Sequence, residues 1–381
     1  MARIIIAPDS FKESLDSAKV ARHISNGIKR VWPETEIIEV PLSDGGEGLL
    51  KIMAAADGGQ IIVEEATGPL GLTVSASYGL LGDGQTAVIE MAEASGLALV
   101  PPGSRNPMKT TTFGTGELIR AALDRGCRRI IVGIGGSATN DGGAGMAQAL
   151  GVKLLDDRGG EIGPGAEGLL SLNSIDITGL DDRIGKVEIM VACDVDNIFH
   201  GPEGAACVYG PQKGAGPEMV AELDRALEHL SAVIQRDLGI DISHLPGAGA
   251  AGGLGGGLVA FLGGKMNRGS HIVFEILKFE ELLAEGADLV ITGEGEINGQ
   301  SVYGKVPVAV ARLAKKRNLP VLALVGSIGP GAEKVYSEGI DAIMSIVPRP
   351  ISLEEAMGQA AVLLEDAAER AVRIMGLFRN I

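Results

Sequence analysis

Cysteine and histidine are scarce in this sequence, and the few that occur form no recognisable site. The three cysteines contain no Cys-x-x-Cys pair, and the five histidines show neither metal-ligand nor catalytic-triad spacing. A Gly-x-Ser-x-Gly nucleophile elbow is also absent. The sequence therefore argues against a zinc framework and against cofactor-free nucleophilic catalysis, and it indicates a reducing compartment.

Long apolar runs and an excess of basic residues are missing as well. No apolar run reaches the ~18 residues that a membrane span needs, and residues 1–8 are typical of a strand rather than of a signal peptide. A net charge of -16 disfavours nucleic acids and anionic membranes as partners. We therefore expect a cytoplasmic protein that binds neither nucleic acid nor membrane.

Hydrophobic residues and glycine, in contrast, are abundant. Hydrophobic residues make up 45% of the 381 positions, and the 57 glycines follow no repeat period. This composition is sufficient for a large core and indicates many tight turns between strands and helices. A chain of this length is expected to form two domains.

Strand and helix patterns alternate at both ends of the chain. Apolar runs at residues 3–7 and 36–40 predict strands on either side of a helix that starts near Ser14 or Asp16 and ends near Val31. The last hundred residues repeat this pattern, with strands at 288–292, 321–325 and 342–347 and helices at 306–317 and from about 352. Such alternation predicts a parallel sheet with right-handed crossovers.

The middle of the chain carries more turns, and its clearest strands are predicted at residues 86–90, 129–134 and 188–192. We therefore predict an α/β fold of two domains. Residues 1–60 and 283–381 form the first, and residues 61–282 form an α/β domain inserted into it. A sequential division of the chain is the alternative.

The most informative loop, residues 135–145 (GGSATNDGGAG), lies between a predicted strand and a predicted helix. Glycines let the backbone approach a ligand, and the N–H groups of a loop and of a helix N-terminus bind anions. The polar residues Ser137, Thr139, Asn140 and Asp141 suit a phosphate, a polyol or a metal. A tight turn with polar caps is the alternative.

Further polar loops suggest chemistry at the carboxyl ends of the predicted strands, where ligands bind in open α/β sheets. Their candidate residues are Asp9 and Lys12 in residues 8–14, Asp44 and Glu47 in 44–48, Asp194 and Asn197 in 192–197, Gln212 and Lys213 in 210–214, and Glu294 in 292–298. Helix-capping or solvated turns are the alternative for the first two loops.

Two matches to nucleotide-binding patterns are set aside. Residues 247–252 fit Gly-x-Gly-x-x-Gly but follow no strand, so a loop before a packed glycine-rich helix is preferred. Residues 299–305 fit Gly-x4-Gly-Lys, but Val306 stands where a P-loop needs Ser or Thr. The remaining glycine loops, carboxylates and sparse lysines suit phosphoryl transfer.

Taken in order, PDSFKES, DGGEG, GTGE, GGSATNDGGAG, ACDV, GPQKGA, PGAGAAGG and ITGEG resemble the bacterial type 1 glycerate kinase family over essentially the whole chain. The resemblance implies phosphorylation of D-glycerate by ATP with Mg²⁺, most often at the 2-hydroxyl. It also implies a flavodoxin-like (Rossmann-like) parallel-sheet domain formed by both chain ends, with an inserted mixed α/β domain. Glu296, Asn298 and Ile198 depart from the family pattern, which has Arg, Asp and Pro there.

On this resemblance we assign roles as hypotheses. Asp194 is the base that takes the hydroxyl proton, ahead of Asp44 and Asp141, and Lys12 is a further catalytic candidate. Substrate contacts are assigned to Asp9, Ser10, Glu47, Arg105 and Lys213, nucleotide contacts to Gly135, Gly136, Ser137, Thr139, Asn140 and Gly142, and metal contacts to Asp141 and Glu294.

Other functions remain open at this point. They are a glycerate kinase that forms 3-phosphoglycerate, a kinase for another small hydroxy acid or polyol, and a sugar-acid or nucleotide sensor without catalysis. Carboxylates gathered at strand ends count against a sensor, because buried charges are costly unless they bind something. The sequence also leaves open whether the protein is a homo-oligomer.

Overall fold

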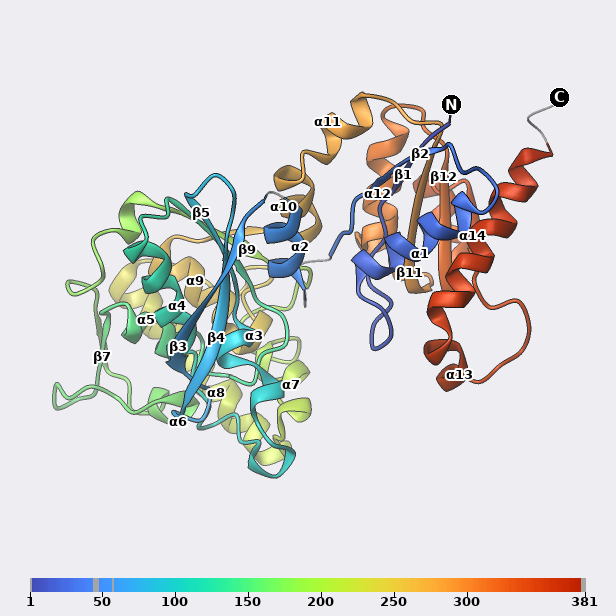
Figure 1. The fold of residues 1–381 in the computed structure, drawn as a ribbon. Helices are drawn as coiled ribbons and strands as arrows, with labels where there is room; N and C mark the ends of the chain where they lie inside the picture. Colours follow the sequence, from blue (N-terminus) through green and yellow to red (C-terminus); the bar gives the residue numbers. More distant parts are fainter. Residues whose placement is uncertain (1, 44–47, 57, 378–381) are drawn as a thin grey trace. The chain divides into compact units, whose positions relative to one another are not determined.

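The computed structural model describes residues 2–43, 48–56 and 58–377, and the chain divides into two compact units (Figure 1). Unit 1 comprises residues 1–44 and 270–381, and unit 2 comprises residues 45–269. Each unit contains a sheet of its own, and parallel strand pairs occur in both. The α/β class predicted from the sequence is therefore confirmed.

Unit 1 is built from short apolar strands that alternate with amphipathic helices. Its strands are β1 (Arg3–Ile6), β2 (Glu36–Glu39), β11 (Leu289–Ile297), β12 (Val321–Ile328) and β13 (Ala342–Ser345). Its helices are α1 (Ser17–Lys29), α11 (Phe279–Ala284), α12 (Val306–Lys315), α13 (Leu353–Gly358) and α14 (Ala360–Gly376), and α10 (Gly269–Ile276) begins at the boundary with unit 2. Two helix starts follow the capping rule, since Asp16 and Ser352 accept N–H bonds from Lys19 and Glu355.

All five strands of unit 1 run parallel, in the order β13-β12-β11-β1-β2. One face of the sheet, with Ile4, Ile6 and Ile291, packs against α1 and α14. Alternate residues point to the other face, where α12 contacts β11 and β12. The carboxyl ends of the strands consequently meet at one edge of the sheet.

Unit 2 carries a mixed sheet and most of the glycine-rich loops. Its strands are β3 (Gln60–Thr67), β4 (Thr73–Leu80), β5 (Thr86–Glu90), β6 (Arg129–Gly133), β7 (Lys153–Leu155), β8 (Ser174–Asp176), β9 (Glu188–Ala192) and β10 (Lys265–Asn267). Its helices are α2 (Leu49–Ala56), α3 (Ala92–Ser95), α4 (Phe113–Asp124), α5 (Ala144–Ala149), α6 (Gly165–Leu169), α7 (Ala205–Tyr209), α8 (Pro217–Leu238) and α9 (Leu254–Leu262).

The main sheet of unit 2 has the order β10-β9-β6-β5-β4-β3. The pairs from β10 to β5 are parallel, whereas β5-β4 and β4-β3 are antiparallel. Gly133 at the end of β6 pairs with Ala192 at the end of β9. The loops that follow these two strands therefore leave the sheet side by side at the same edge.

The unit boundaries differ from those predicted at residues 60 and 282. Helix α2 packs against β3, β4 and β5, so this segment belongs to unit 2. Helix α11 packs against α12 and belongs to unit 1. Short amphipathic helices carry no sequence signal that tells which sheet they will cover.

Within the described ranges, none of the helices combines the length and apolar character needed to cross a bilayer.

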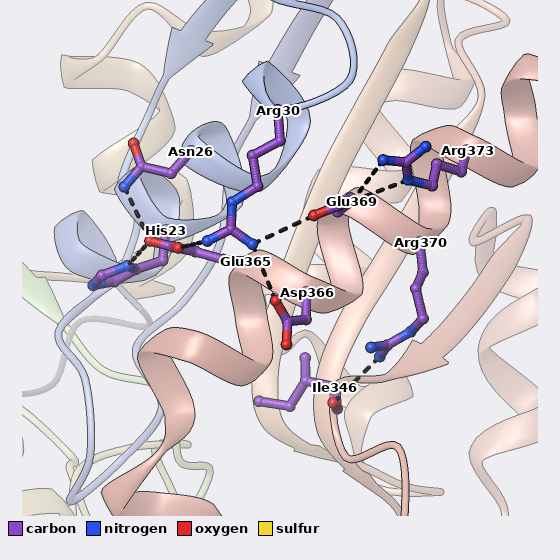
Figure 2. A network of polar contacts seen from close by, with 9 residues as sticks. All are labelled: His23, Asn26, Arg30, Ile346, Glu365, Asp366, Glu369, Arg370 and Arg373. Atoms are coloured by element: carbon purple, nitrogen blue, oxygen red, sulfur yellow. Dashed lines mark hydrogen bonds and ion pairs between the residues drawn. The ribbon is translucent and has the colours of Figure 1, made fainter.

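Helices α1 and α14 lie side by side and share a polar network (Figure 2). Their backbones come close at Gly27, where a Cβ atom would lie 2.1 Å from the Glu365 carbonyl oxygen. The Glu365 carboxylate lies 2.8 Å from His23 Nδ1, accepts from Asn26 at 3.1 Å and pairs with Arg30. These bonds, led by that of His23, lower the pKa of Glu365.

Glu365→Ala should lower the free energy of unfolding by about 1–2 kcal/mol, because a mostly buried carboxylate loses three polar partners. The matched control is Asp366→Ala, whose half-exposed side chain contacts only Arg30 in this network and should cost at most about 0.5 kcal/mol. Denaturant titration of both variants measures the difference. Equal losses would contradict the central role of Glu365.

Candidate functional site

In unit 1, a cavity of about 720 Å³ opens at the carboxyl ends of β1, β11, β12 and β13. Its polar lining includes Asp9, Ser10, Lys12, Glu294 and Lys305. The predicted residues Asp9, Ser10, Lys12 and Glu294 are therefore brought together. Asp44 and Glu47, also predicted for this sheet edge, lie outside the described residues.

Two buried carboxylates lie at this edge and are 8% and 6% exposed: Asp9 in the loop after β1 and Glu294 on the neighbouring strand β11. The Asp9 N–H donates to the Gly293 carbonyl at 2.9 Å, which ties the loop after β1 to β11. The Glu294 carboxylate accepts from Ser301 Oγ at 2.9 Å and from Lys305 Nζ at 3.0 Å. Lys305 thus neutralises one of the two carboxylates.

Asn298 organises the turn that follows β11. Its side-chain oxygen accepts from the Gln300 N–H at 2.9 Å, and its N–H donates to Ser301 Oγ at 3.2 Å. The same Ser301 hydroxyl donates to Glu294. Asn298 therefore supports the position of Glu294 through Ser301, a role that needs no charge.

In unit 2, the loop 135–145 is organised by one buried carboxylate. Asp141 is fully buried and accepts from Thr112 N at 2.8 Å, Thr112 Oγ1 at 2.9 Å, Gly143 N at 3.2 Å and Gly145 N at 3.3 Å. Burial raises the pKa of Asp141, and these bonds oppose the rise. Both carboxylate oxygens are engaged, which does not favour the predicted metal role of Asp141.

The glycines of this loop serve close packing. A Cβ at Gly145 would lie 2.2 Å from Thr111 Oγ1. Gly252, in the segment before α9, packs against the same loop, since a Cβ there would lie 1.9 Å from the Thr139 carbonyl. The Gly142 N–H donates to the Gly252 carbonyl at 3.0 Å. The N–H groups of Gly142, Gly143 and Gly145 are therefore not available to a phosphate, contrary to the prediction for Gly142.

The same contact explains the Gly-x-Gly-x-x-Gly pattern at residues 247–252. This segment leads into α9, and a Cβ at Gly249 would lie 2.0 Å from the Ile198 carbonyl. The segment itself is therefore buried and packed, whereas the sequence predicted a flexible loop before a packed glycine-rich helix.

Lys213 is buried against the loop, with 1% exposure. Its Nζ donates to Ser137 Oγ at 2.8 Å and to the Thr139 carbonyl at 2.6 Å. Burial lowers the pKa of Lys213 to about 7, and the charge of Asp141 opposes this shift. Arg105 lies alongside, because a Cβ at Gly214 would be 2.9 Å from Arg105 Cβ. The structure therefore brings Arg105, Lys213 and the loop together.

Asn140 has no exposed surface, and neither its Nδ2 nor its Oδ1 has a partner among the residues that the structure describes. The same is true of Thr139 Oγ1 and Arg105 Nε. Buried amides without hydrogen bonds are rare and costly, so such a group indicates a ligand or a water molecule. The motif placed Asn140 in the loop, but only the structure reveals its missing partners.

Asp194 follows β9 and leaves the sheet beside the loop that follows β6. Its carboxylate accepts from the Gly269 N–H at 3.2 Å, and Arg268 donates to its carbonyl at 2.8 Å. Arg268 and Thr112 are functional candidates that sequence reasoning missed, since each lies in a segment without a distinctive motif.

No group of three or more His, Cys, Asp or Glu suitable for a metal occurs in the described part of the chain. Mg²⁺ in phosphate-handling sites commonly uses one or two carboxylates together with phosphate oxygens and waters. Asp9 and Glu294 are the candidates for this role among the described residues, because both are buried carboxylates that line the unit 1 cavity. Both Glu294 oxygens already accept hydrogen bonds, so a metal there would have to replace Lys305 or Ser301 as a partner.

Comparison with known proteins gives consistent matches. The profile described as "Glycerate kinase family" matches residues 4–376. The glycerate kinase of Halalkalibacterium halodurans is 53% identical over 97% of both chains, and the glycerate 2-kinase of Escherichia coli is 51% identical over 93% of both. A crystal structure from Salmonella typhimurium LT2, provisionally named glycerate kinase 2, superposes with a TM-score of 0.90 at 49% identity and full coverage.

The buried amine of Lys213 predicts a pH-dependent stability. Between pH 7 and about 10.5 the unfolded chain retains a proton that the folded chain has released, so the free energy of unfolding rises with pH. Relative to Lys213→Met, the wild type should gain roughly 3–5 kcal/mol across this window.

Denaturant unfolding of both proteins between pH 6.5 and 9.5 tests this prediction. Titrating groups distant from Lys213 cancel in the difference between the two proteins, and the lost bonds to Ser137 and Thr139 add only a constant. The interaction of Lys213 with Asp141 does not cancel and is part of the measured effect. A difference that does not change with pH would show that Lys213 titrates normally.

Proposed function

The chain belongs to the glycerate kinase family, and we propose that it transfers the γ-phosphoryl group of ATP to the 2-hydroxyl of D-glycerate. The chain is a kinase of this family, and kinases of the family use ATP. The choice of the 2-hydroxyl rests on the 51% identity to the glycerate 2-kinase of Escherichia coli. Formation of 3-phosphoglycerate is the competing outcome.

We propose that the polar group in unit 2 binds the acceptor acid. Arg105 supplies a guanidinium for the carboxylate, and the Asn140 amide can both donate to and accept from a hydroxyl. The unpartnered state of Asn140 supports this role. Ser137 and Thr139, predicted as nucleotide ligands, are better assigned to this acceptor site because Lys213 already bonds to both.

We propose Asp194 as the base for the 2-hydroxyl, because the strand pairing brings it out beside the acceptor loop. Lys12 is proposed to neutralise negative charge on the transferred phosphoryl group. The protein catalyses such a transfer mainly by positioning the reactants and stabilising charge. Mg²⁺ would be held by Asp9 and Glu294 and would screen the charge of the phosphates when bound. No contact of Gly135 or Gly136 with a phosphate forms part of this proposal.

A flavodoxin-like arrangement is part of the proposal for unit 1. Counted within the unit, its strands have the order 2-1-3-4-5, which is the flavodoxin order. In that arrangement ligands bind at the carboxyl ends of the strands, and the cavity with Lys12 lies at that edge.

The purified protein should release ADP when supplied with ATP, Mg²⁺ and D-glycerate, and ³¹P NMR should show 2-phosphoglycerate as the product. L-glycerate and other small hydroxy acids serve as acceptor controls. A 3-phosphoglycerate signal would overturn the regiochemistry alone. Turnover with another acid but not with D-glycerate would overturn the assignment of D-glycerate as the substrate. Binding of D-glycerate without turnover would favour a sensor.

Asp194→Asn should lower kcat by about 10²–10⁴-fold, since a positioned base contributes that much, while KM for ATP changes little. The matched control is Asp196→Asn, two residues along the same loop, where an exposed carboxylate pairs with Arg268. This control should retain near wild-type kcat. Equal activity of the two variants would exclude Asp194 as the base.

A further inference from the structure

The unit 1 cavity is amphipathic, and most of its apolar side chains come from one segment, with Phe11 and Ile328 elsewhere in the lining. The segment from the end of β13 to the start of α14 contributes apolar side chains, namely Ile346, Val347, Ile351, Leu353, Ala356, Met357 and Ala360. The loop after β1, the strand β11 and the turn before α12 contribute the charged ones, namely Lys12, Glu13, Asp9, Glu294, Glu296 and Lys305.

The size of this cavity does not suit the acceptor acid. Its volume of about 720 Å³ lies in the range of sites for drug-sized ligands, whereas glycerate is a three-carbon acid with polar groups on every carbon. An apolar wall provides no hydrogen-bond partners for the polar groups of such a molecule. A ligand with a flat apolar part joined to a charged part would match both halves of the lining.

The charged half of the cavity restricts the ligand further. Two lysines, Lys12 and Lys305, face a lining that also contains four carboxylates. Lys305 already pairs with Glu294 at 3.0 Å. A polyphosphate would be repelled by this lining unless a divalent cation accompanied it, and this is the form in which kinases use ATP.

We propose that the unit 1 cavity is the ATP site, with the adenine against the apolar segment at residues 346–360 and the phosphates toward Lys12 and Lys305. A purine has apolar faces for the first half, and the ribose and phosphates have polar groups for the second. This inference rests on the proposed function in one respect, that ATP is the phosphoryl donor. It moves the nucleotide away from the loop 135–145, where the N–H groups of Gly142, Gly143 and Gly145 are engaged within the protein.

The test fills the apolar half with a side chain. Ala356 lines the cavity on α13 and is partly buried, so Ala356→Trp should place an indole where the base would bind. We expect the Kd for ADP, measured by calorimetry with Mg²⁺, to rise at least ten-fold, while KM for D-glycerate stays within two-fold. Ala361→Trp is the matched control, since Ala361 is also partly buried but lies outside the cavity lining.

An unchanged Kd for ADP in a folded Ala356→Trp would overturn the inference, even when the wild type turns over glycerate. No glycerate-dependent ADP release by the wild type, with ADP binding still lost in Ala356→Trp, would instead overturn the proposed function and leave the nucleotide site standing. The two failures are therefore distinguishable.

A second measurement on the wild type decides the matter if Ala356→Trp does not fold. Photolabelling with 8-azido-ATP should modify peptides from residues 345–360, and excess ATP should prevent the labelling. Labelling confined to peptides from residues 45–269 would place the base in unit 2 and overturn the inference.

Discussion

The buried carboxylate of Asp141 is the interaction on which the organisation of unit 2 depends. It joins the start of α4 to the loop after β6, because Thr112 and two loop glycines donate to it. An uncompensated charge at this depth would be strongly unfavourable, so these donors are required for the fold. The position of Asn140 follows directly, since the next residue in the chain is fixed by four hydrogen bonds.

Because of the Asp141 hydrogen bonds, the glycines of the loop 135–145 have a different role from the one that the sequence suggests. Glycine-rich loops before helices often cradle phosphates with their N–H groups. Here, Asp141 uses the N–H groups of Gly143 and Gly145, and the carbonyl of Gly252 uses that of Gly142. Side chains such as Asn140 and Lys213 are then left to provide the chemistry. Glycine enrichment alone therefore does not distinguish a phosphate cradle from two backbones in close contact.

Much of unit 1 could be predicted because its determinants are local. Apolar runs mark β1, β11 and β12, and Asp16 and Ser352 mark helix starts through short-range capping. The motifs likewise located Lys12, Lys213 and Asp141. The missing partners of Asn140, the burial of Lys213 and the packing of α2 on unit 2 depend on residues far apart in the chain. No local pattern encodes such contacts.

The two units offer binding environments of different character, and this difference constrains the assignment of substrates. Around Asn140, buried polar atoms lack partners among the described residues, which is why we propose a small acid as their ligand. The unit 1 cavity instead combines an apolar wall with charged residues at the ends of β1 and β11. The transfer proposed above needs one ligand of each kind, a small hydroxy acid and a nucleotide. If the two ligands exchanged sites, the Asn140 amide would face a bulky base and the apolar wall of the unit 1 cavity would face a polar acid. Both mismatches carry a desolvation cost.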